Sequence, residues 1–147
     1  MGVLRYPFFL MATISYGTST ELDAVNSILM SVGESPVNTL TVQSPEVAIA
    51  QKTLQQVCRE VQAEGWVFNT EHEYPITLDS SNHCVVPQNV LEIDLSHARH
   101  GDHFNVIRKK DNGITKLYDK IEHQFNFESV NESKLYCDII WMLEFEE

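Results

Sequence analysis

The sequence changes character at the stretch Gly65-Trp66-Val67-Phe68-Asn69-Thr70-Glu71. Before it, from Thr20 to Glu64, apolar residues recur at the three- and four-residue spacing of helices. After it, from Tyr74 onward, apolar and polar residues alternate with the period of β-strands, between turn residues. The sequence therefore predicts an α+β protein, in which an N-terminal helical hairpin packs on a small antiparallel β domain, either a sandwich or a partial barrel.

Two helices are expected in the first part. The first should begin after Thr20, whose hydroxyl can accept hydrogen bonds from free backbone amides, and should end at Gly33. The second should begin at Ser44-Pro45, since serine caps helices and proline loses nothing in a first turn, and should end at Gly65. Its apolar residues follow a coiled-coil-like spacing, which we interpret as a seam facing the core: Val47, Ala50, Leu54, Val57 and Val61.

Trp66 and Phe68 follow the second helix directly. Because large aromatic side chains bury much apolar area, we expect them to form a plug between the helices and the β domain. With three residues of the seam they make up the predicted structural anchors, a buried spine of Leu54, Val57, Val61, Trp66 and Phe68.

The second part reads as about five or six strands. Ile76 and Leu78 alternate toward a turn at residues 79–82, and residues 84–86 form a short return strand. The remaining expected strands are residues 91–95, 104–109, 114–118 and 135–145, of which the middle two flank the hairpin signal Asn112-Gly113.

We divide the chain into three parts: an apolar leader at residues 1–11 that is not part of the fold, the helical hairpin at residues 12–66, and the β-rich domain at residues 67–147. The apolar stretch at the start is short, contains Pro7 and lacks a clear small-residue cleavage site, so we do not interpret it as a secretory signal.

Composition excludes some classes of function. With 10 basic and 21 acidic residues, the net charge is -11, and a chain of this charge repels nucleic acid at long range. No run approaches the roughly 20 apolar residues of a membrane helix, so no membrane partner is expected. Cys58, Cys84 and Cys137 form neither a zinc motif nor a redox pair by spacing, which favours a reducing cytoplasm as the place of synthesis.

Few residues suggest chemistry. His97, His100 and His103 recur every third residue and are the alternative metal-site prediction, but we expect an exposed loop there, because ligands at this spacing converge only on a helix. Arg108-Lys109-Lys110 is a basic cluster that we place on the shoulder of a hairpin. Two carboxylate pairs, Glu71 with Glu73 and Glu144 with Glu146, have the spacing of a strand's outer face. We predict no catalytic residues, no metal and no cofactor.

Several blocks of the sequence resemble the tail tubular protein A family of short-tailed bacteriophages. The first blocks are residues 22–29 (LDAVNSIL) and 32–37 (VGESPV), followed by residues 60–71 (EVQAEGWVFNTE). Residues 86–94 (VPQNVLEID), 117–119 (LYD) and 143–147 (LEFEE) look like later blocks of the family. The order and spacing of these blocks cover residues 12–147.

This resemblance implies a structural virion protein, the adaptor or gatekeeper between the portal and the tail nozzle. It implies a homo-oligomeric ring of about twelve copies, which requires a heterologous interface between neighbours. The expected partners are the portal protein and the nozzle protein, with DNA only passing through the lumen. Members of the family continue past the LEFEE block into a C-terminal helix, so we expect that this helix is missing here.

Two other classes of function stay open at this stage. One is a tail-associated hydrolase, either metal-assisted through the three histidines or based on a pair of carboxylates. The other is a generic acidic interaction module without any phage context.

Overall fold

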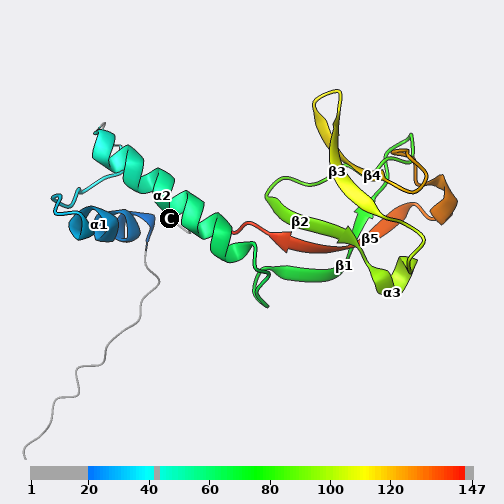
Figure 1. Cartoon of the computed structure of the whole chain (residues 1–147), viewed down its shortest axis with the longest axis horizontal. Coiled ribbons are helices and arrows are strands. Elements are labelled where there is room, and N and C mark those ends of the chain that lie inside the picture. Colours follow the sequence, from blue (N-terminus) through cyan, green and yellow to red (C-terminus); the bar gives the residue numbers. More distant parts are fainter. Residues whose placement is uncertain (1–19, 42–43, 145–147) are drawn as a thin grey trace, which may run out of the picture.

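The computed structural model describes residues 20–41 and 44–144 and shows a mixed α+β fold (Figure 1). The predicted leader, residues 1–11, lies outside these ranges. In chain order the elements are α1 (Glu21–Ser31), α2 (Pro45–Gln62), β1 (Thr70–Thr77), β2 (Val90–Leu95), α3 (His97–His100), β3 (Val106–Asp111), β4 (Ile114–Asp119), the 3-10 helix η1 (Glu128–Val130) and β5 (Lys134–Trp141). The α+β prediction is confirmed.

The helical hairpin forms for the reasons expected from its ends. Thr20 Oγ1 accepts a hydrogen bond from Asp23 N, and Asp23 Oδ2 accepts one from Thr20 N, so the two residues make a reciprocal cap on α1. Ser44 Oγ accepts from Val47 N at the start of α2, directly before Pro45. The two helices share a small core of Val25, Leu29, Val47 and Ala50.

The β region is built around β5. This strand lies at the centre of a three-stranded antiparallel sheet of order β1-β5-β2, while β3 and β4 form a separate two-stranded sheet. Both residues of the predicted Asn112-Gly113 turn have positive φ angles, 49° and 83°, as a tight hairpin turn requires. The main core is larger than that of the helices and consists of Ile76, Cys84, Ile93, Leu95, Leu117, Phe127, Leu135, Cys137 and Ile139.

The predicted hairpin between residues 76–78 and 84–86 is wrong. The turn itself exists, because Asn82 N donates to Asp79 O and Asp79 N donates to His83 O. However, β1 pairs with β5, with Ile76 opposite Leu135, and the chain after the turn crosses to the second sheet, where Val85 bridges Lys116 of β4. Pairing with the distant β5 allows β1 to join a three-stranded sheet, which an isolated hairpin cannot provide.

The predicted buried spine is also wrong for four of its five residues. Leu54 is partly buried and packs against the helical core. The other four are exposed: Val57 and Val61 by 48% each, Trp66 by 46% and Phe68 by 66%. The reason is helix length: α1 has 11 residues and α2 has 18, and the buried residues of α1, Val25 and Leu29, pack against Val47 and Ala50 in the first half of α2.

A polar joint, and no aromatic plug, connects the two parts. The side chain of Asn69, only 2% exposed, accepts from Trp66 N at 2.8 Å and donates to Gln62 O at 2.9 Å and to Trp141 O at 3.0 Å. Gln62 adds two hydrogen bonds to the backbone of Leu143. The end of α2 is thereby fixed to the end of β5.

Gly65 is required for this joint. Its φ of +74° is unfavourable for other residues, and a Cβ there would lie 2.8 Å from Ile140 Cδ1. Glycine is therefore needed after the end of α2 for two reasons: the backbone conformation there and the close approach of β5.

No helix within the two described ranges has the combination of length and apolar character that is needed to cross a bilayer.

The two environments of phenylalanine give a matched test of burial. Phe127 is fully buried in the β core. Its replacement by alanine should lower the free energy of unfolding by about 3 to 5 kcal/mol. Phe68→Ala should cost less than about 1 kcal/mol, because most of the ring is already in water. Urea unfolding followed by circular dichroism measures both; equal losses would contradict the exposed position of Phe68.

The joint is tested by Asn69→Ala. Removing three hydrogen bonds at a buried site should lower the unfolding free energy by about 2 to 4 kcal/mol. The two tryptophans of the chain, Trp66 and Trp141, both contact Asn69, so their fluorescence should change with the joint. Asn38→Ala, at an exposed position of the connector between α1 and α2, is the control. A loss no larger than that of the control would show that Asn69 does not hold the joint.

Candidate functional site

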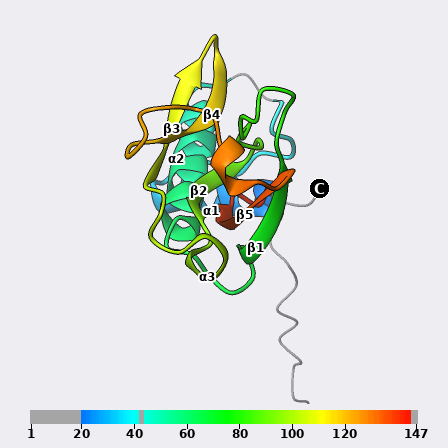
Figure 2. The ribbon, with the colours of Figure 1, turned by 90° about the vertical axis from the view of Figure 1, so that its right-hand side faces the viewer.

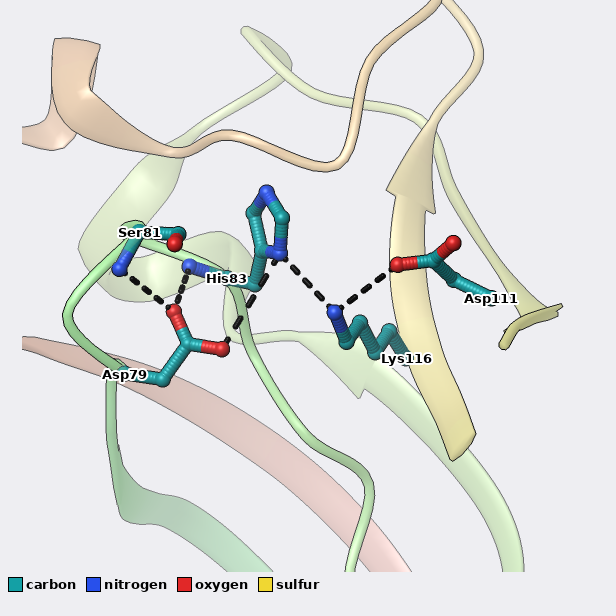
Figure 3. Close-up of polar contacts among 5 residues, drawn as sticks. All are labelled: Asp79, Ser81, His83, Asp111 and Lys116. Atoms are coloured by element: carbon teal, nitrogen blue, oxygen red, sulfur yellow. Dashed lines mark hydrogen bonds and ion pairs between the residues drawn. The ribbon is translucent and has the colours of Figure 1, made fainter. Parts of the chain in front are cut away.

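A buried lysine joins the two sheets of the β region. Lys116 of β4, 9% exposed, places its Nζ 2.9 Å from Asp111 Oδ2 and 3.0 Å from His83 Nδ1 (Figure 3). Because an ammonium group can only donate, His83 Nδ1 must accept, and the neutral ring then carries its proton on Nε2. The cluster ties the loop after β1 to the β3–β4 hairpin.

Asp79 holds the same loop from its other side. Its Oδ1 accepts from Ser81 N at 2.8 Å and from His83 N at 2.9 Å, and its Oδ2 lies 3.9 Å from His83 Nδ1 (Figure 3). The hydrogen bond from the His83 amide is the main cause that lowers the pKa of Asp79; the Ser81 amide and the charge of Lys116 act in the same direction, against some desolvation.

The arrangement contains serine, histidine and aspartate but lacks the geometry of a nucleophilic triad. Ser81 participates through its backbone N–H, and within the described residues no hydrogen bond joins its hydroxyl to His83. A triad needs that bond, because the histidine must take the proton of the attacking hydroxyl. We therefore interpret this cluster as an anchor for the loop.

The expected loop position is wrong for His97 and His100, which form the single turn of α3. His103 does lie in the exposed loop that follows α3. His100 is buried and accepts from Tyr136 N through Nε2 at 3.1 Å. Burial is the main cause that lowers the pKa of His100; the charge of Glu132 opposes this shift and that of Arg99 adds to it. The side chain of His97 points to a different partner, with its Nδ1 atom 3.2 Å from Asp102 Oδ1.

His100 and His103 do share an open cavity of about 600 Å³ with Glu122 and Glu132. His97 does not line it, and among the described residues no three histidine, cysteine, aspartate or glutamate side chains converge as metal ligands would.

The predicted carboxylate pair of Glu71 and Glu73 separates in the fold. Glu71 accepts from Trp141 Nε1 at 2.8 Å, whereas Glu73 pairs with Arg99 of α3 at 3.0 Å. A bulge in β1 between Glu71 and Tyr74 turns the two side chains to different partners. Glu144 is exposed, and Glu146 lies outside the described residues.

Two cysteines come together in three dimensions. Cys84 and Cys137 are fully buried in the β core, and a hydrogen bond between their thiols, together with burial, raises the pKa of Cys137. Such thiols are inert, because the thiolate is the reactive form.

The surface also contains an apolar groove. It has a volume of about 280 Å³ and lies at the joint, lined by Val57, Cys58, Val61, Gln62, Phe68, Leu143 and Glu144; we call it the junction groove. Trp66 lies beside it, with its ring stacked on that of Phe68 at 6.5 Å between centroids. Clustered exposed apolar side chains of this kind are typical of contact surfaces.

The family model described as Tube: Tail tubular protein matches residues 22–147. No curated protein matches the chain.

Lys116→Met tests the anchor in the β region. Removing the ammonium group leaves Asp111 and His83 without their shared donor, which should cost about 1 to 3 kcal/mol of unfolding free energy. Lys120→Met, at an exposed position just after β4, should change it by less than about 0.5 kcal/mol. Chemical denaturation of the two variants in parallel makes the comparison. A Lys116 variant as stable as the Lys120 variant would mean that the cluster does not anchor the loop.

Proposed function

The chain belongs to the tail tubular protein family, and on that premise we propose that it is the adaptor subunit between the portal and the tail nozzle of a short-tailed phage. As a member of this family it is a structural component of a bacteriophage tail. The observation that carries the proposal is a family match that extends from α1 to the end of the chain.

In this proposal the protein assembles as a ring of about twelve copies, after synthesis in the cytoplasm of the host bacterium. One end of the ring binds the portal protein and the other receives the nozzle protein. The ring helps to retain the packaged genome and later conducts it during ejection.

Two features of the chain support a role in assembly. The helical hairpin extends from the β region and is joined to it at the end of α2 (Figure 1), which leaves large faces of both parts open to neighbours. The junction groove adds apolar surface that a lone soluble protein rarely keeps uncovered.

The charge of the chain supports the passage of DNA. A net charge of -11 repels phosphate groups, so a lumen lined with these carboxylates would not retain DNA. A basic groove would do the opposite, since it binds DNA by releasing counterions.

Binding to the portal tests the proposal. We expect the purified chain to sediment with purified portal protein of the same phage, to saturate at about one chain per portal subunit, and to appear as a ring on the portal in electron micrographs. Double-stranded DNA should not sediment with the complex at physiological salt. A chain that stays in the supernatant with the portal at every concentration tested would refute the adaptor role.

A further inference from the structure

We propose that the junction groove is one half of the contact between neighbouring subunits, and that its occupant is the tip of the β3–β4 hairpin of a second copy of this chain. The inference rests on the proposed ring and specifies its interface.

The groove continues a helix surface that already serves as an interface within the chain. Val47 and Ala50, in the first half of α2, are buried against α1. Val57 and Val61 extend the same stripe along α2 beyond the core that it shares with α1, and both are 48% exposed. Phe68 and Leu143 form the opposite wall, so the stripe becomes a groove with an apolar floor.

Acidic side chains border this groove. Glu144 is part of its lining. Glu60 follows the groove residue Val57 by three positions on α2, which places the two side chains next to each other on the helix surface. An occupant with an apolar centre and basic flanks would therefore match both the floor and the rim.

The β3–β4 hairpin has these properties. It projects beyond the rest of the β region in both views (Figure 1 and Figure 2). Ile107 and Ile114 are 41% and 50% exposed, and the strand register places them on the same face as Lys109. Residues 108–110, Arg-Lys-Lys, are the one run of three basic residues in the sequence.

The hairpin is presented in a fixed position. Arg108 Nη1 donates to Val90 O of β2 at 3.1 Å, and the ammonium group of Lys109 lies 4.2 Å from the centre of the Tyr118 ring. Lys116, opposite Lys109 in the strand register, holds the hairpin to the loop after β1. A rigid projection loses little conformational entropy when it binds.

Groove and hairpin are different surfaces of one chain. Each copy can insert its hairpin into the next copy and receive the hairpin of the previous one, which is the heterologous contact that closes into a ring.

Disulfide crosslinking with the native Cys58 tests the contact. Cys58 lines the groove, and Cys84 and Cys137 are buried, so Ile114→Cys introduces the matching thiol at the tip. Because burial and Glu21 raise the pKa of Cys58, oxidation is carried out at alkaline pH, both on the chain alone and on the chain bound to portal. We expect a ladder of crosslinked oligomers that reducing agent removes.

Two controls make the ladder specific. Ile114→Cys combined with Cys58→Ser should give no ladder, and neither should Ser129→Cys, which places a thiol at an exposed site on η1. No ladder from Ile114→Cys, a ladder that persists without Cys58, or an equal ladder from Ser129→Cys would overturn the proposal and would point to another occupant of the groove.

A charge exchange tests the rim. Lys109→Glu and Glu144→Lys should each weaken subunit association about twofold to fivefold, and the chain that carries both should recover it, since the pair is restored across the interface. Circular dichroism confirms that each variant folds. If the double variant is weaker than both single variants, Lys109 and Glu144 do not face each other.

The portal sedimentation assay separates this proposal from the proposed function. Rings on the portal without the crosslink would leave the adaptor role intact and reject only the hairpin contact.

Discussion

The arrangement of the whole chain depends on the hydrogen bonds of one buried amide. Asn69 binds three backbone groups, from the end of α2, the turn after it and the end of β5. Hydrogen bonds of this kind are directional, so they fix the angle between the helical hairpin and the β region without needing apolar contact area. For this reason the apolar residues near the joint, such as Phe68, remain available to other surfaces.

The chain consequently contains two separate cores with an uncovered groove between them. The core of the hairpin has only four buried residues, while the β core is larger. A small helical pair gains little from its own packing, and the second half of α2 adds apolar surface that it does not cover. A subunit of an assembly can tolerate this, because neighbouring chains contribute the missing contacts. Membership of a family of phage tail proteins agrees with such a role.

Local signals predicted the helices and one hairpin correctly. Thr20 and Ser44 cap the helices where expected, and Asn112-Gly113 turns between β3 and β4. These features depend on residues a few positions apart, which a linear pattern shows. The Lys116 cluster escaped prediction because its members are distant in sequence, and the only local hint was a lysine in an alternating strand. The burial of His100 was missed because it depends on Tyr136 of β5.

The sequence by itself determined the α+β class, the starts of both helices, the tight turn and the resemblance to a tail family, because capping, periodicity and turn chemistry act over short distances. Only the tertiary structure decided which apolar residues are covered. The spacing of Val57 and Val61 is that of a core seam, yet burial requires a second surface, and α1 is too short to supply one. Amphipathic periodicity therefore specified which face of α2 makes contacts. The lengths and connections of the other elements specified that, within the described residues, only the first part of this face is buried.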